Sequence, residues 1–161
     1  MSYAKGTTVE VARSRAEIDS LLVRNGATSV GILNDTEKSL AAVAFVIKGA
    51  RFRLEIPLPT NADVARLPKP QGWTWKAPAF RETWCANMLA QLHRERWRAV
   101  LLLIKSKLEI VRIGLSSVER EFMADLVLPG GQRAEVFMAE AIRRGLEAGD
   151  AAPMLGPGNV D

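Results

Sequence analysis

The longest regular pattern of apolar and polar residues runs from Pro78 to Gly114 and predicts a helix of about ten turns. Pro78 stands where the first turn of a helix tolerates proline, and Gly114 stands where a left-handed cap ends one. Two apolar sides form on this helix, and a narrow polar seam runs between them. The seam consists of Arg94, Arg98, Lys105 and Arg112. A helix that is apolar on two sides is covered from both, so we expect a central helix with Leu103 in the core.

Shorter patterns before this helix predict an antiparallel sheet. Three β-rich segments are separated by turn residues; they are Thr28–Leu33, Ser39–Ile47 and Arg51–Ile56. Their short connections make them an antiparallel meander. Thr7–Val11 is predicted to be an earlier strand. Ser14 and Glu17 have the spacing of a capping box, which opens a helix that ends at Asn25 and Gly26.

The segment between sheet and helix, residues 57–78, holds five of the eight prolines together with Trp73 and Trp75. A long connection of this kind is usually functional or flexible, and its tryptophans are expected to pack back onto the domain. After the long helix, a second capping box at Ser116 opens a short helix, and Arg133–Ala148 has the spacing of a last amphipathic helix. Residues 150–161 have the composition of a flexible tail.

The predicted order is therefore β-α-β-β-β, long helix, short helix, helix, which is typical of an α+β fold. Residues 1–149 are expected to form a single domain with a Pro/Trp-rich loop at 57–78. In this arrangement the central helix lies on the meander sheet with one apolar side. The two shorter C-terminal helices cover its other side.

The charge is unevenly distributed along the 161 residues. Residues 1–112 carry 18 Lys and Arg against 10 Asp and Glu, whereas residues 113–161 carry 4 against 8. This asymmetry favours an anionic partner for the first part, with nucleic acid as the commonest choice. Basic surfaces without a polyanion partner are equally common. No apolar run is long enough for a membrane span, the N-terminus lacks a signal peptide, and one cysteine fits a reduced, cytoplasmic location.

The sequence contains no catalytic or metal-binding constellation. His93 is the sole histidine and lies on an apolar side of the helix, where a packed imidazole is the expected role. Cys85 is eight residues away and about 80° around the helix, so the two side chains cannot form a catalytic pair. No phosphate-binding loop, dinucleotide motif or zinc motif is present, and no cofactor is expected.

A set of basic and aromatic residues remains as the candidate binding site. Arginine and lysine bind phosphates, and flat aromatic rings stack on unpaired bases, so this combination suits single-stranded nucleic acid. The candidate residues are Arg51, Arg53, Lys69, Trp73, Trp75, Lys76, Arg94, Arg98, Lys105 and Arg112. The alternative is structural: a charged seam lets a buried helix reach solvent, and a tryptophan in a proline-rich loop can hold that loop down. Under that alternative, Arg94 and Arg98 pair with acids of the C-terminal helices, such as Glu119 or Glu140.

The segment RERWRAVLLLIKSKLEIV, from Arg94 to Val111, is followed by Gly114, Glu121-Phe122 and Leu128-Pro-Gly-Gly. It resembles a family of uncharacterised proteins from tailed phages and prophages. The likeness covers about residues 7–148, with support from the Ser14-Arg-Ala-Glu-Ile opening. It implies a phage or prophage origin and supplies no activity. The predicted strand and helix order is also similar, at the level of topology alone, to that of phage single-strand annealing proteins.

Two functions follow as hypotheses. The first is a phage accessory protein, not an enzyme, that binds nucleic acid in replication, recombination or repair. The second is a protein-interaction module, such as a small inhibitor of a host protein, with Trp73 and Trp75 as anchors. Neither requires a membrane, and homo-oligomers are compatible with both.

Overall fold

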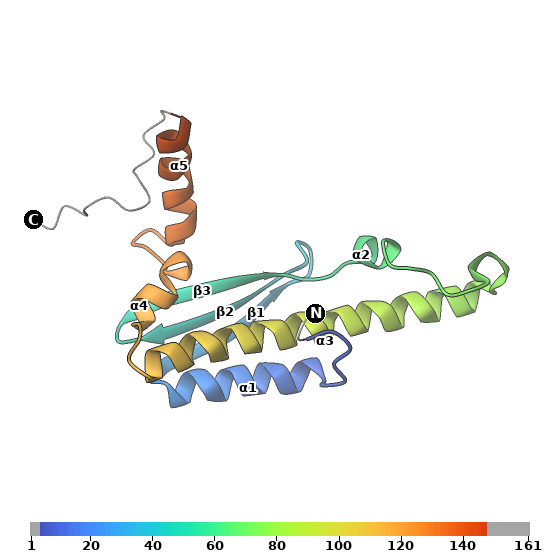
Figure 1. Ribbon diagram of the computed structural model, residues 1–161, viewed down its shortest axis with the longest axis horizontal. Coiled ribbons are helices and arrows are strands. Elements are labelled where there is room, and N and C mark those ends of the chain that lie inside the picture. The colour runs from blue at the N-terminus through green and yellow to red at the C-terminus, as the bar shows by residue number, and fades with distance from the viewer. Residues whose placement is uncertain (1–3, 148–161) are drawn as a thin grey trace, which may run out of the picture.

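A three-stranded sheet and the long helix α3 dominate the computed structural model, which describes residues 4–147. The fold is α+β: an N-terminal helix, a three-stranded antiparallel meander, a long helix and shorter C-terminal helices (Figure 1). The predicted fold class and meander are confirmed. The tail predicted at residues 150–161 lies outside the described residues.

The sheet consists of β1 (Ala27–Asp35), β2 (Leu40–Ile47) and β3 (Ala50–Pro57), in the order β1-β2-β3. Val43 of β2 lies opposite Ile32 of β1 and Leu54 of β3, so alternate residues of all three strands point to the same face. All three predicted strands are present, with ends within two residues of the predicted ones. Tight turns join them, because Lys48 and Gly49 adopt positive φ between β2 and β3.

The first predicted strand is absent, and the first helix begins earlier than expected. Helix α1 spans Val11–Arg24, with Glu10 in extended conformation at its N-cap. Ser14 lies inside the helix and is fully buried with Ile18 and Leu22, and its hydroxyl has no hydrogen-bond partner among residues 4–147. The predicted capping box was wrong because Ser14 belongs to the apolar stripe that packs on the sheet. The order of elements at the N-terminal end is therefore α-β-β-β and not β-α-β-β-β. The predicted likeness in topology to phage single-strand annealing proteins depended on that first strand and is lost.

Helix α3 spans Pro78–Arg112 and ends as the sequence predicts. Gly114 has a φ of 79°. Its N–H donates to the Val111 carbonyl, and the N–H of Leu115 donates to the Ile110 carbonyl. These two bonds form a Schellman motif, which requires the left-handed backbone that glycine adopts without strain.

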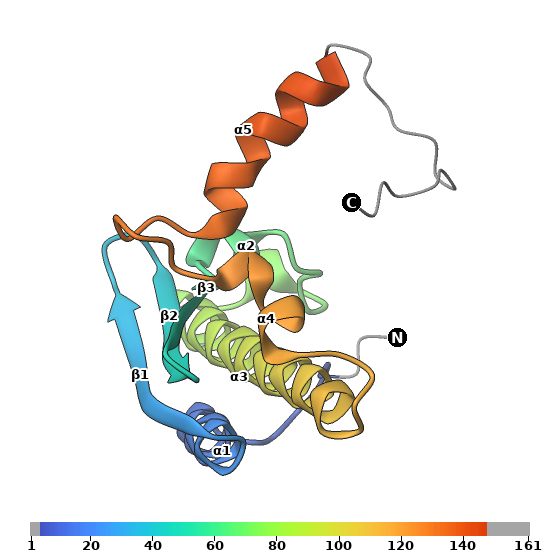
Figure 2. The same cartoon turned by 90° about the vertical axis from the view of Figure 1, so that its left-hand side faces the viewer.

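The expectation that α3 is covered on both sides was wrong. One side is buried on the sheet through five residues, Trp97, Val100, Leu101, Ile104 and Leu108. On the other side Leu103 is 45% exposed. Helix α1 lies beside α3 on the same face of the sheet, and neither C-terminal helix crosses the far side of α3 (Figure 2).

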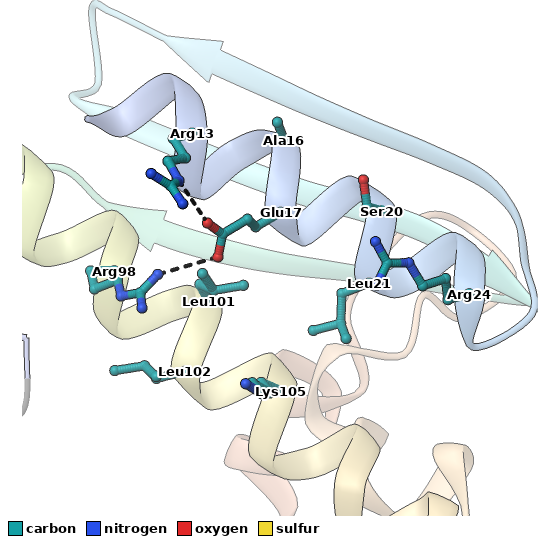
Figure 3. Close-up of a pocket in the computed structure, with 10 residues that line it drawn as sticks. All are labelled: Arg13, Ala16, Glu17, Ser20, Leu21, Arg24, Arg98, Leu101, Leu102 and Lys105. Carbon is teal, nitrogen blue, oxygen red and sulfur yellow. Dashed lines mark hydrogen bonds and ion pairs between the residues drawn. The ribbon is translucent and has the colours of Figure 1, made fainter. Parts of the chain in front are cut away.

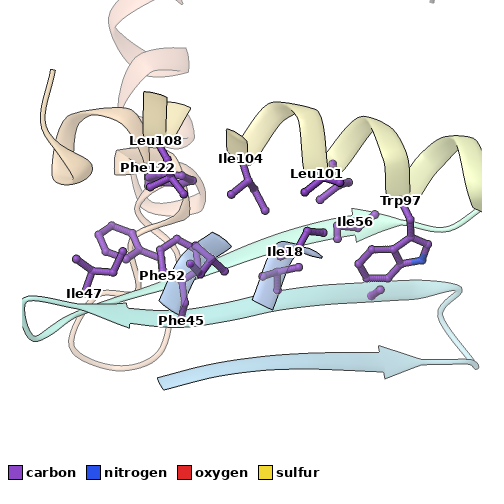
Figure 4. Packing of buried hydrophobic residues seen from close by; sticks show 14 of the residues in the cluster. Ile18, Phe45, Ile47, Phe52, Ile56, Trp97, Leu101, Ile104, Leu108 and Phe122 are labelled. Atoms are coloured by element: carbon purple, nitrogen blue, oxygen red, sulfur yellow. The ribbon is translucent and has the colours of Figure 1, made fainter. Parts of the chain in front are cut away.

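The core lies between this pair of helices and the inner face of the sheet (Figure 4). Its centre is aromatic. Phe45 stacks on Phe52 with ring centroids 5.1 Å apart, and Phe122 meets Phe45 edge-on at 5.3 Å. Phe122 belongs to the C-terminal segment, so this ring fastens that segment to the sheet.

The C-terminal segment follows the edge of β3 and then leaves the domain. It forms α4 (Val118–Glu121), the short 3-10 helix η2 (Met123–Asp125) and α5 (Ala134–Glu147). The Ser117 hydroxyl, one residue after the predicted Ser116, accepts from the N–H of Arg120 at the start of α4. The N–H of Val127 donates to the Arg51 carbonyl of β3. Helix α5 then projects away from the sheet and α3 (Figures 1 and 2).

The loop at 57–78 is more structured than predicted. It contains the short helix α2 (Asn61–Ala65) and the 3-10 helix η1 (Trp73–Trp75). Val64 of α2 is buried, and α2 packs on α3. The loop accompanies the part of α3 that extends beyond the sheet (Figure 1).

Candidate functional site

The described residues, 4–147, hold no cluster of metal-binding side chains. No three His, Cys, Asp or Glu side chains among them gather where they could hold a metal ion. His93 is half-buried, and its Nε2 lies 3.1 Å from the Pro59 carbonyl oxygen. It therefore ties α3 to the start of the loop that follows β3, which agrees with the predicted packed imidazole. Nor does any helix in this range combine the length and apolar character of a membrane span.

The ten candidate residues fall into three separate places. Arg94, Arg98 and Lys105 lie along α3 toward α1, and Arg112 follows at its C-terminal end. Lys69, Trp73, Trp75 and Lys76 lie around the N-terminal end of α3. Arg51 and Arg53 alternate along β3 with the core residue Phe52, so they point away from the helices. The sheet therefore separates this pair from the cations of α3.

The largest concentration of cations lines a groove between α1 and α3, of about 560 Å³ (Figure 3). Its charged lining residues are Arg13, Glu17, Arg24, Arg98 and Lys105. Four cations and one carboxylate give the groove a formal charge of +3. Apolar side chains, among them Leu21, Leu101 and Leu102, form the rest of the lining. We call this hollow the α1–α3 groove.

Two of its cations are held by the single carboxylate. Glu17 lies 3.2 Å from Arg13 Nε and 3.3 Å from an Arg98 nitrogen. Arg94, one turn before Arg98, donates to Gln91 at 2.7 Å and lies 3.9 Å from Glu10. The expectation that Arg94 and Arg98 pair with the C-terminal helices was wrong: their acidic partners belong to α1 and the residue before it. These pairs lie in register because the two helices run side by side in the same direction.

The other two cations of the α1–α3 groove, Arg24 and Lys105, are not held by a carboxylate of the groove. Among the described residues, neither Arg24 nor Lys105 takes part in a salt bridge or a hydrogen bond through its side chain. Arg24 closes the C-terminal end of α1, and Lys105 lies on the facing turn of α3 (Figure 3). No side-chain bond therefore keeps either cation from a phosphate, although the charge of Lys105 also acts on the Glu109 carboxyl. Arg13 and Arg24 were missed by sequence reasoning, because only the packing of α1 on α3 brings them beside the predicted seam.

A second hollow, of about 430 Å³, continues along α3 toward its N-terminal end. Lys5 and Arg94 line it, together with Glu95. The Glu95 carboxylate accepts from the N–H of Gly6 at 2.7 Å, which holds the N-terminal segment against α3. The basic surface therefore runs from Lys105 through Arg98 and Arg94 to Lys5.

Arg112, the last residue of the predicted seam, is engaged locally. It donates two hydrogen bonds to Glu109, one turn earlier on α3. These bonds, together with the charges of Arg112 and Lys105, lower the pKa of the Glu109 carboxyl below its ordinary value of 4.5. The pair is nearly neutral, so Arg112 adds little to the basic surface.

The two tryptophans of the loop have different surroundings. Trp73 meets Trp84 of α3 edge-on at 5.0 Å, and Lys69 lies over both rings while it donates to the Val64 carbonyl. Trp73 therefore fastens the loop to α3, as expected. Trp75 is 88% exposed, so the prediction that both tryptophans pack back was wrong for this one. Lys76 lies 4.8 Å above the ring of Phe80.

Of the two cations of β3, Arg53 belongs to an ionic cluster on the edge of the sheet. Arg53 lies 3.2 Å from Glu55, whose carboxylate also lies 3.2 Å from Arg133. Arg133 further contacts Asp125 and Glu135, at 3.7 and 2.8 Å. Arg53 is thus engaged in holding the C-terminal segment against β3. Arg51 is exposed.

The chain was also compared with known proteins. No protein-family model matches it, and neither a curated protein nor a solved structure does.

Proposed function

We propose that this protein binds single-stranded nucleic acid through the α1–α3 groove, as a phage or prophage accessory protein in replication, recombination or repair. The observation that carries the proposal is the +3 lining of the groove, in which neither Arg24 nor Lys105 forms a salt bridge with a described residue. Phosphate contacts by lysine and arginine supply most of the affinity of non-specific nucleic-acid binding. The phage setting rests on the sequence resemblance of the Arg94–Val111 segment.

The exposed ring of Trp75 supplies a base-stacking surface at the other end of α3. From Pro78 to Arg98, the helix rises about 30 Å. A single nucleotide cannot contact both places, whereas a strand of about nine nucleotides at ~3.4 Å spacing can. Affinity is therefore expected to increase with oligonucleotide length until the strand spans this distance.

The test is titration of fluorescent oligonucleotides of increasing length at several salt concentrations. Reversing the charges of Arg94 and Arg98 would break their contacts with Glu10 and Glu17. A loss of binding could then result from a loss of stability. The better variant combines Arg24→Glu with Lys105→Glu. It should weaken binding to all sequences alike and reduce the slope of log K against log[salt] by about 2.

Lys38→Glu is the control for a cation outside the groove, because Lys38 is exposed and lies in the β1–β2 turn, where its Nζ is 3.6 Å from an Asp35 oxygen. It should bind as wild type does. Trp75→Ala should reduce the binding free energy by about 1–3 kcal/mol, and only for oligonucleotides long enough to reach Trp75. Wild-type protein that binds no oligonucleotide at low salt would refute the proposal.

The second candidate function is a protein-interaction module, and the exposure of Trp75 favours it. Tryptophan is enriched among residues that dominate binding energy at protein interfaces. Under this alternative, Trp75→Ala would abolish capture of a protein partner, while the Arg24 and Lys105 reversals would leave capture unchanged.

A further inference from the structure

The outer side of α3 carries a helix-packing seam that the described chain leaves open. Ala99, Leu103, Ser106, Ile110 and Ile113 follow one another at intervals of four, three, four and three residues. This is the spacing with which one helix packs along another. Leu103 and Ile110 are exposed, and the Ser106 hydroxyl donates to the Leu102 carbonyl, so its polar group is already satisfied. We call these five residues the α3 seam.

The first part of the α3 seam, Ala99 to Ser106, lines an open hollow of about 700 Å³. Its lining consists of Ala99, Leu102, Leu103, Lys105, Ser106 and Glu109. All six residues belong to α3, so the hollow is an open apolar strip of one helix with Lys105 and Glu109 beside it. Such a strip can pack along the apolar side of an amphipathic helix.

Helix α5 is such an amphipathic helix, and its apolar side is also uncovered. Phe137, Met138 and Ile142 gather on one side of it, and all three are exposed; Phe137 is 60% exposed. Within the described chain α5 packs mainly on η2. At about 1.5 Å per residue, its 14 residues measure about 21 Å, and Ala99–Ile113 spans a similar length.

We propose that α5 of one copy docks on the α3 seam of a second copy, and that the exchange is reciprocal and forms a two-fold dimer. Helix α5 points away from the α3 of its own chain (Figures 1 and 2), so the seam of another copy is the surface open to it. Exchange of a terminal element is an accessible route to dimers. A single contact then covers both apolar surfaces.

The charges of the two surfaces support a second copy as the occupant. Helix α3, which carries four of the five residues of the α3 seam, has a net charge of +4 from 7 cations and 3 acids. Helix α5 has a net charge of −1 from 2 cations and 3 acids. Opposite charges attract the C-terminal part of one chain to the α3 of another. Pairing of two α3 seams would instead bring two basic surfaces together.

The first experiment measures mass in solution by light scattering. Wild type should have twice the 17.7 kDa of one chain. Leu103→Glu and Phe137→Glu should each be monomeric. Val23→Glu is the matched control, because Val23 is an equally exposed apolar residue on α1, and it should stay dimeric. An equimolar mixture of the two monomeric variants should regain part of the dimer, since a mixed pair retains one intact α5–seam contact.

The second experiment uses substitutions that preserve the fold. In a Cys85→Ser background, Leu103→Cys and Phe137→Cys are prepared as separate proteins and oxidised alone and together. Disulfide-linked dimers should form only when the two proteins are mixed. Linkage of Leu103→Cys with itself would show that two seams pair. A monomer-sized intrachain link in the double variant would show that α5 docks within its own chain. Either result, or monomeric wild type, would overturn the proposal.

Discussion

Phe122→Ala should be among the most damaging substitutions in this chain. The ring is completely buried, and replacing a buried phenylalanine by alanine typically costs about 3–5 kcal/mol. Two neighbouring rings place the expected cost toward the upper end. Phe45 meets it edge-on at 5.3 Å and Phe52 lies at 6.0 Å, and each such pair contributes about 0.5–1.5 kcal/mol beyond burial. The Lys107 ammonium lies 4.8 Å from the ring centroid and adds a cation–π contact.

Urea denaturation followed by circular dichroism measures this cost. With a slope of roughly 2 kcal/mol per molar urea, a loss of about 4 kcal/mol moves the midpoint down by about 2 M. Met123→Ala is the matched control, because the next side chain is 58% exposed and should change the free energy of unfolding by less than about 0.5 kcal/mol. All three proteins are compared at one chain concentration. A loss below about 1 kcal/mol for Phe122→Ala would refute the docking of the C-terminal segment on the sheet.

The parts of the fold that sequence reasoning predicted correctly are those fixed by local chemistry. Strand β3 alternates because its inner residues, such as Phe52, reach the core while Arg51 and Arg53 reach the other face. Pro78 and Gly114 mark the ends of the long helix, because each suits a backbone conformation that occurs only there. Such signals depend on neighbours in the chain and need no knowledge of tertiary packing.

The errors came from contacts between distant parts of the chain. Helical periodicity shows that Leu103 lies on an apolar side, but it does not show whether another element covers that side. The Ser14–Glu17 spacing suits a capping box, yet the same spacing occurs inside a helix. There Ser14 turns toward the sheet and Glu17 reaches Arg98, 81 residues away.

The candidate site was predicted as a set of residues without its geometry. Arg98 and Lys105 were identified from α3 alone, but the facing Arg24 could be added only once α1 was known to lie beside α3. Trp73 and Trp75 are two residues apart and indistinguishable by sequence. They differ in the structure because the ring of Trp73 packs edge-on against Trp84, in the first turns of α3.

Two further substitution tests follow from burial. Leu101→Ala should cost about 2–5 kcal/mol, because Leu101 is buried on the sheet. Leu103→Ala should cost far less when measured at concentrations where the chain is monomeric; equal costs would mean that both sides of α3 are covered within one chain. The last prediction concerns pH. Asp125 is buried, and its desolvation raises the pKa of its carboxyl above the ordinary 3.8, against the opposing charges of Lys107 and Arg133. The folded state therefore holds this proton more tightly than the unfolded state does. Its contribution to stability is complete below pH 3.8 and is lost as the pH rises through the raised pKa of the folded state. Urea denaturation across pH 3–7 should thus show wild type losing stability relative to Asp125→Asn as the pH rises through this window. A difference that changes in the opposite direction would mean that Arg133 and Lys107 outweigh burial and stabilise the ionised carboxylate.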